Sequence, residues 1–168
     1  MTPIFMNSTT IVLTITTTSV ALVAGLFYAY SCSVNPGLHP LSDKEYLVAM
    51  QSINRAILNP LFFASFMGTL LLLPISTWMS YEKTLPPQFI LLLLSTLVYI
   101  IGVFGVTVIG NIPLNEALDK FQIQAASLQE MAKLRSMFET RWNFFHQIRT
   151  IASVGSLVLA IVSCIYSK

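Results

Sequence analysis

The chain has 168 residues, of which 55% are hydrophobic and only 10% are charged, and its formal net charge is +2. This composition excludes an ordinary soluble domain, and the thin charge, without a basic stripe, excludes nucleic acid as a partner. An integral membrane protein of the size of one small helical bundle is predicted.

Four stretches are long and apolar enough to cross the hydrocarbon, which takes about 20 residues per helix. We place them near residues 9–31, 58–79, 88–109 and 142–166. The first lacks a basic leader and a small-residue cleavage site, so we expect it to be a span and not a signal peptide. The predicted fold is all-α: one four-helix transmembrane domain over residues 1–168, with a cap of short helices from the first and third connections.

The first predicted span ends in aromatic residues, and a stretch of helix breakers follows. Phe27 and Tyr28 are typical either of an interfacial belt or of a pocket lining. Residues 35–40 predict a turn, and Ser42 with Glu45 three residues later forms a capping box. A short helix is therefore expected to start there and to run through Asn54.

The two cysteines, Cys32 and Cys164, match no metal-ligand or redox spacing. In an up-and-down bundle three spans separate them, which places them about 30 Å apart on opposite membrane sides. A disulfide needs Cα atoms within about 7 Å. We expect both thiols to be unpaired and buried in the helices.

The second connection, residues 80–87, is short, so the second and third spans are expected to be antiparallel neighbours. The third is long and contains Asn111, Pro113 and Asn115. Pro113 predicts a turn into a new helix with exposed N–H groups. The asparagines then either donate to a substrate carbonyl or oxyanion or cap the helix, and capping is expected for one of them. Residues 118–135 are amphipathic and predict one or two helices over the bundle mouth.

The polar residues that could carry chemistry are expected to converge. Antiparallel order places the first and third connections on the same membrane side, together with the start of the last span. The residues concerned are Asn54, Asn111, Asn115, Trp142, His146 and Arg149. Basic residues also gather on this side, which by the positive-inside rule predicts that it is cytoplasmic, in a bacterial inner membrane. They are Lys44, Arg55, Lys120, Lys133, Arg135 and Arg141, against Lys83 and Lys168 on the other side.

Trp142, His146 and Arg149 follow one another at i, i+4 and i+7, which places them on one helix face. Burial and a neighbouring cation both disfavour a protonated imidazole, so His146 is a candidate general base. The alternative is structural: Arg149 extends to the interface and His146 bonds a carbonyl. His39 lies in a Pro-rich turn without a polar partner at helical spacing, so His39→Ala is expected to matter much less than His146→Ala.

No metal site and no cofactor are predicted. His39 and His146 are the only histidines, and neither has an acidic residue at ligand spacing. Haem with His146 as its single axial ligand is the alternative.

Taken in order along nearly the whole chain, these motifs resemble the anthrone oxygenase-like membrane protein family (DUF1772). The matching pieces are residues 25–28, 34–38, 50–54 and 111–115, then Arg141-Trp142, His146 and Arg149-Thr150. Named members of that family are implicated in oxidising anthrones to anthraquinones with O₂, apparently without a dedicated cofactor, whereas most bacterial members have no assigned substrate.

The resemblance implies a dry aromatic pocket with a base and donors for an enolate oxygen. His146 is then the base, and Arg149, Asn111 and Asn115 stabilise the enolate. Trp142, Phe27 and Tyr28 hold the ring, and Asn54 closes the pocket.

The expected function is a membrane-embedded oxygenase acting on a hydrophobic aromatic molecule, anthrone-like or quinol-like. The partners expected are that molecule, which arrives from the bilayer, O₂ and membrane lipid, with self-association left open. The alternative is a non-catalytic membrane protein that binds haem, quinone or lipid, or that assists assembly of a partner complex.

Overall fold

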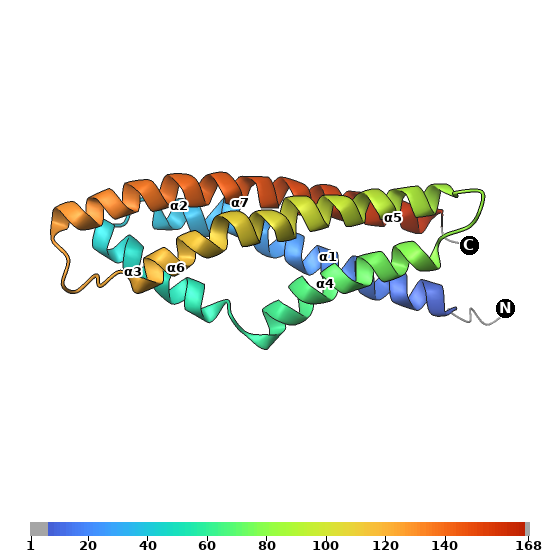
Figure 1. Cartoon of the computed structure of the whole chain (residues 1–168), viewed down its shortest axis with the longest axis horizontal. Coiled ribbons are helices and arrows are strands. Elements are labelled where there is room, and N and C mark those ends of the chain that lie inside the picture. Colours follow the sequence, from blue (N-terminus) through green and yellow to red (C-terminus); the bar gives the residue numbers. More distant parts are fainter. Residues whose placement is uncertain (1–6, 167–168) are drawn as a thin grey trace.

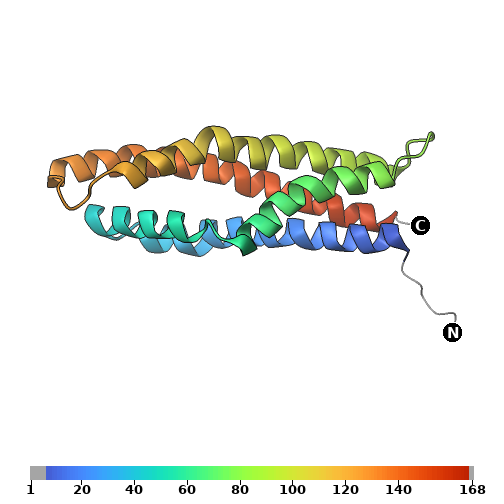
Figure 2. The same cartoon turned by 60° about the horizontal axis from the view of Figure 1, so that its bottom comes forward.

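The computed structural model describes residues 7–166, which form an elongated bundle of helices (Figures 1 and 2). Within this range every regular element is helical. The elements are α1 (Ser8–Ala29), η1 (Tyr30–Val34), α2 (Asn35–Leu38), α3 (Asp43–Ala56), α4 (Pro60–Met79), α5 (Pro87–Val98), η2 (Tyr99–Gly105), η3 (Thr107–Asn111), α6 (Ile112–Lys120) and α7 (Leu128–Ile165), where η marks a π-helical segment.

Four helices are long and apolar enough to cross a membrane, which confirms the predicted all-α transmembrane bundle. They are Ser8–Leu38, Pro60–Met79, Pro87–Lys120 and Leu128–Ile165. The start of α1, the connection between α4 and α5, and the end of α7 lie at one end of the bundle, whereas α3, α6 and the start of α7 lie at the other (Figure 1). Lys168, which entered the orientation argument, lies outside the described residues.

The predicted turns at residues 35–40 and around Pro113 were largely wrong, because both helices continue through their prolines. A π-helical segment precedes each proline. The amide of Asn35 bonds the carbonyl of Tyr30, and that of Ile112 bonds the carbonyl of Thr107, each five residues back. Proline interrupts the ordinary i→i−4 bonding, and a local π-helical adjustment reconnects the backbone inside a membrane bundle. The first helix therefore extends to Leu38 and the third to Lys120.

The cap consists of α3, which packs against α6 and the first part of α7. The predicted capping box at the start of α3 is confirmed: Ser42 Oγ accepts from the Glu45 amide. The Ser42 hydroxyl and amide donate to the Glu45 carboxylate and hold its pKa below its usual range. The fourth helix begins at Leu128 and not near 142, after a second capping box formed by Ser127 and Glu130. The amphipathic stretch, residues 118–135, is thus divided between the end of α6, a connection over residues 121–127 and the start of α7.

Small hydroxyl residues connect the helices inside the bundle. Ser95 Oγ lies 2.9 Å from Ser156 Oγ, between α5 and α7. Thr16 Oγ1 lies 2.7 Å from Ser76 Oγ, between α1 and α4, and also donates to the Val12 carbonyl of its own helix. Such bonds join helices where the surrounding lipid provides little hydrophobic drive for association.

Helix packing is close where α7 meets the third helix at Gly102. A Cβ added at this glycine would lie 2.6 Å from Ala152 Cβ, far inside van der Waals contact. We expect Gly102→Ala to destabilise the protein in detergent by about 1–3 kcal/mol, the usual range for overpacking. Thermal unfolding followed by circular dichroism measures the loss. The double variant Gly102→Ala/Ala152→Gly should recover most of it, and equal destabilisation of both variants would contradict this contact.

Cys32 and Cys164 are free thiols, as predicted, but both are exposed on the outer surface, so the expected burial was wrong. We expect the two thiols to report opposite membrane faces because three spans separate them. Each single-cysteine variant is labelled with an impermeant maleimide in sealed vesicles, before and after permeabilisation. Labelling of both from the same side would contradict the four-span topology.

Candidate active site

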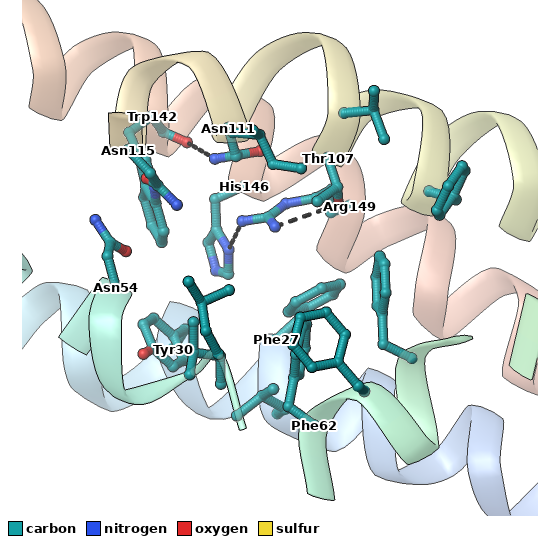
Figure 3. A pocket seen from close by; sticks show the side chains of 18 of the residues that line it. Phe27, Tyr30, Asn54, Phe62, Thr107, Asn111, Asn115, Trp142, His146 and Arg149 are labelled. Carbon is teal, nitrogen blue, oxygen red and sulfur yellow. Dashed lines mark hydrogen bonds between the residues drawn. The ribbon is translucent and has the colours of Figure 1, made fainter. Parts of the chain in front are cut away.

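A cavity of about 370 Å³ lies where the cap meets the bundle, and we call it the substrate cavity (Figure 3). Its volume falls within the range of about 300–1,000 Å³ usual for small-molecule sites. Most of its wall is aromatic or aliphatic: Leu26, Phe27, Tyr30, Phe62, Phe63, Phe66, Met67, Phe104 and Val108. The cavity separates two packed clusters, since Trp142 belongs to the cluster of the cap and Phe27 to that of the bundle.

All the polar residues expected to converge do line this cavity: Asn54, Asn111, Asn115, Trp142, His146 and Arg149. Phe27 lines it as well. Tyr28 does not, and its assignment to the pocket was wrong: it is 61% exposed. Successive residues of a helix are rotated by about 100°, so Tyr28 points outward when Phe27 points inward. Tyr30, three residues after Phe27, takes the inner position.

The two ring nitrogens of His146 have different partners. Nδ1 lies 3.4 Å from Arg149 Nη2, and Nε2 lies 3.0 Å from Ser31 Oγ. A guanidinium only donates, so Nδ1 is the acceptor and the proton of the neutral ring is on Nε2. His146 also stacks on Trp142, with ring centroids 5.0 Å apart and an interplanar angle of 14°. The unprotonated nitrogen thus faces the arginine.

Arg149 is buried in the span, with 6% of its surface exposed. It lies with its Cζ 4.6 Å from the centroid of Phe27 and 5.6 Å from that of Trp142. Its Nη1 donates to Thr107 Oγ1 at 3.4 Å. None of the ion pairs among the described residues includes Arg149. A buried cation held by aromatic faces and weak neutral acceptors favours an electron-rich or anionic ligand.

Neither Asn111 nor Asn115 caps a helix, so the expectation of capping was wrong. Because the helix is continuous at Pro113, it leaves no exposed N-terminal N–H groups to satisfy. Asn115 Oδ1 accepts from Trp142 Nε1 at 2.9 Å. Asn111 Nδ2 donates to the Trp142 carbonyl at 3.4 Å. Both amides therefore hold the segment of α7 that carries His146.

Three buried polar atoms of the cavity residues have no hydrogen-bond partner within the described part of the chain. They are Asn54 Nδ2, Asn111 Oδ1 and Arg149 Nε. Each such atom costs about 1–3 kcal/mol when it is left unsatisfied. Two donors and an acceptor in one apolar cavity indicate a ligand that carries both an electron-rich oxygen and a hydroxyl.

One wall of the cavity belongs to the outer surface of the bundle. Leu58 is 65% exposed, Phe63 44%, Val108 44% and Ile112 41%, and all four line the cavity. They come from the connection before α4 and the start of α4 on one side, and from η3 and α6 on the other. The cavity therefore reaches the outer surface of the bundle along this wall.

A second cavity of about 270 Å³ adjoins the first, and we call it the polar cavity. It is lined by polar side chains from η1, from α2 and the residue that follows it, and from α7, including Ser31, Asn35, His39, Glu139, Asn143 and His146. His39 Nδ1 lies 2.8 Å from Glu139 Oε1. The expectation that His39 lacks a partner considered only helical spacing and missed this contact between distant segments.

Among residues 7–166, His, Cys, Asp and Glu do not gather in any group of three or more that could hold a metal ion. The predicted site residues did not include several that line the two cavities or contact His146: Tyr30, Ser31, Phe62, Phe66, Thr107 and Thr150. Helical spacing was the available signal, since Ser31 follows Phe27 by four residues and Thr107 precedes Asn111 by four. Both residues lay inside the predicted spans 9–31 and 88–109, but which face of each span turns inward was not predicted.

The fold and the site together define a multi-pass membrane protein with an internal, largely aromatic cavity in which an imidazole and a guanidinium lie side by side. The family model described as anthrone oxygenase matches residues 60–159, which is more than half of the chain. The protein belongs to the anthrone oxygenase family. The matched region contains Thr107, Asn111, Asn115, Trp142, His146 and Arg149, whereas Phe27, Tyr30 and Asn54 precede it. Neither a curated protein nor a solved structure matches the chain.

Proposed function

We propose that this protein is a membrane-embedded oxygenase that oxidises a hydrophobic aromatic compound, of the anthrone or quinol type, with O₂. The observation that supports it best is the contact between His146 Nδ1 and Arg149 Nη2 inside the aromatic cavity of an anthrone oxygenase family member. The pair supplies a base beside a cation, which is what the formation of an enolate requires.

In the proposed reaction of an anthrone-type substrate, His146 Nδ1 takes a proton from the acidic methylene, and the enolate oxygen accepts a hydrogen bond from Arg149. The enolate passes one electron to O₂, and the two radicals combine to a peroxide anion on the former methylene carbon. Protonation gives a hydroperoxide. Loss of the second C–H proton then cleaves the O–O bond and leaves a ketone and water. The methylene carbon loses four electrons and O₂ gains them, so no resident cofactor is needed.

The other cavity residues orient the substrate in this proposal. Asn111 Oδ1 accepts a hydrogen bond from a phenolic hydroxyl of the substrate, and Asn54 Nδ2 donates one to an oxygen attached to the aromatic ring. Two of the buried atoms without a partner are thereby satisfied. Asn115 acts through Trp142, whose indole it holds against His146. Phe27 and Trp142 pack against the aromatic rings.

The substrate enters from the bilayer, through the wall formed by Leu58, Phe63, Val108 and Ile112. We propose a bacterial inner membrane as the location, with the end that carries α3, α6 and the start of α7 on the cytoplasmic side, because most of the basic residues lie at that end.

The test uses purified protein in lipid nanodiscs with anthrone as the probe. We expect O₂ uptake and formation of anthraquinone well above the rate in empty nanodiscs. A rate equal to that of empty nanodiscs would contradict the enzyme, and anthrone binding without O₂ uptake would favour the non-catalytic alternative. A Soret band in the purified protein would favour the haem alternative.

A further inference from the structure

His146 is the one described residue that lines both the substrate cavity and the polar cavity. Each of the two cavities is adjacent to a different ring nitrogen of His146. Nδ1 contacts Arg149, which lines the substrate cavity, and Nε2 contacts Ser31, which lines the polar cavity. An imidazole can accept a proton on one nitrogen and release one from the other.

A positive charge on His146 is costly because Arg149, which lies beside it, is already a cation. Arg149 lies against the ring on α7, and the other titratable group that faces it is Tyr30 of η1, with ring centroids 5.9 Å apart. The cavity residues contributed by α3 and η3, which are Asn54, Thr107 and Asn111, are neutral. A base that takes the substrate's proton here becomes an imidazolium beside a buried guanidinium, without a described carboxylate to pair with either.

The hydrogen bonds around His146 Nε2 lead away from the substrate cavity. Nε2–H donates to Ser31 Oγ at 3.0 Å, and Ser31 Oγ lies 3.1 Å from Thr150 Oγ1, which itself donates to the His146 carbonyl. Beyond Ser31 lies the polar cavity, whose volume of about 270 Å³ has room for several water molecules and whose walls offer amide and carboxylate partners. Glu139 is 16% exposed and His39 is 76% exposed, so this cavity reaches the surface of the cap.

We propose that the polar cavity is a proton channel for His146, an inference that rests on the proposed function. When Nδ1 takes the methylene proton, Nε2 releases its own proton through Ser31 and water in the polar cavity toward Glu139. The ring stays neutral, now protonated on Nδ1. When the peroxide anion forms, Nδ1–H protonates it and Nε2 takes a proton back by the same route. Each turnover returns the ring to its first tautomer.

The test separates the chemistry of the base from proton release. Protein in nanodiscs is mixed with anthrone without O₂ in a weakly buffered solution that contains a pH indicator. The enolate is followed by its absorbance at longer wavelength than the ketone. We expect the wild type to release a proton for each enolate formed, Ser31→Ala to release none, and Ser31→Thr, which retains a hydroxyl, to behave like the wild type. With O₂ present, Ser31→Ala should turn over about tenfold more slowly.

Ser33→Ala is the matched control, because Ser33 is exposed on the same π-helical segment and lines neither cavity. Asn143→Leu is the second variant: it leaves Ser31 in place and fills the polar cavity with an apolar side chain, and it should also abolish proton release. Proton release by Ser31→Ala at the wild-type level, or enolate formation by the wild type without proton release, would overturn the channel alone. Absence of an enolate in the wild type would overturn both proposals.

Discussion

Replacement of His146 by alanine is expected to reduce anthrone oxidation by about 10² to 10⁴, the usual contribution of a general base. The protein should remain folded, because the ring forms only a few hydrogen bonds and its ring contacts are limited to Trp142, Phe27 and Tyr30 among the described residues. O₂ uptake in nanodiscs measures the activity, and size-exclusion chromatography with thermal unfolding in detergent measures the fold.

Two further histidine variants make this prediction specific. His146→Gln can still hydrogen-bond Ser31 but has no basic nitrogen, so it should be as inactive as His146→Ala. His39→Ala should cost far less: His39 is largely exposed, and Arg135 still donates to Glu139 at 2.9 Å. An active His146→Gln protein, or a His39→Ala protein that is more damaged than His146→Ala, would contradict the role of the base.

The sequence was sufficient for the fold class and for the convergence of the polar residues. Hydrophobic length alone defines the four spans, because a helix must satisfy its own backbone inside lipid. The alternation of span direction then places Asn54, Asn111 and the start of the last span at one end. The capping box at Ser42 was also predicted from the sequence, because its signal is a local spacing of two residues.

The details of the site depended on helix geometry that local rules describe poorly. Pro36 and Pro113 were taken as helix ends, although a π-helical segment absorbs each of them. Ser31 and Thr107 lay inside the predicted spans, but span ranges alone do not define which helix face turns toward His146 and Arg149. Tyr28 and Tyr30 could not be told apart by composition, because only the phase of the helix decides which of them faces inward. The contact between His39 and Glu139 joins segments that no sequence spacing relates.

The family match covers only part of the candidate site. The match covers residues 60–159 and therefore the base, the guanidinium and the asparagines of the third helix. The wall formed by Phe27 and Tyr30, and the amide of Asn54, come from the part of the chain before it. Residues from both parts of the chain determine the shape of the cavity. Differences in the part before residue 60 are therefore expected to distinguish substrates within the family.

Arg149→Lys is expected to lose about 10²-fold in activity, the usual cost of removing a donor to a developing oxyanion. Lysine keeps the charge but has no planar fork. It cannot contact Thr107 and His146 at once while lying flat against Phe27, as the guanidinium does. Expression and thermal stability in detergent should be retained, because a cation remains at the same position. The assay is again O₂ uptake with anthrone.

Arg141→Lys is the matched control, since Arg141 is exposed on the same helix and lines neither cavity; it should be fully active. If Arg149 only extended to the membrane interface, lysine would serve equally well, because both side chains carry a cation on a long apolar stem. A fully active Arg149→Lys protein would therefore assign Arg149 a structural role and leave His146 without its proposed partner. Loss of activity in Arg149→Lys together with an unchanged Arg141→Lys protein indicates that the planar guanidinium holds the oxygen of the enolate.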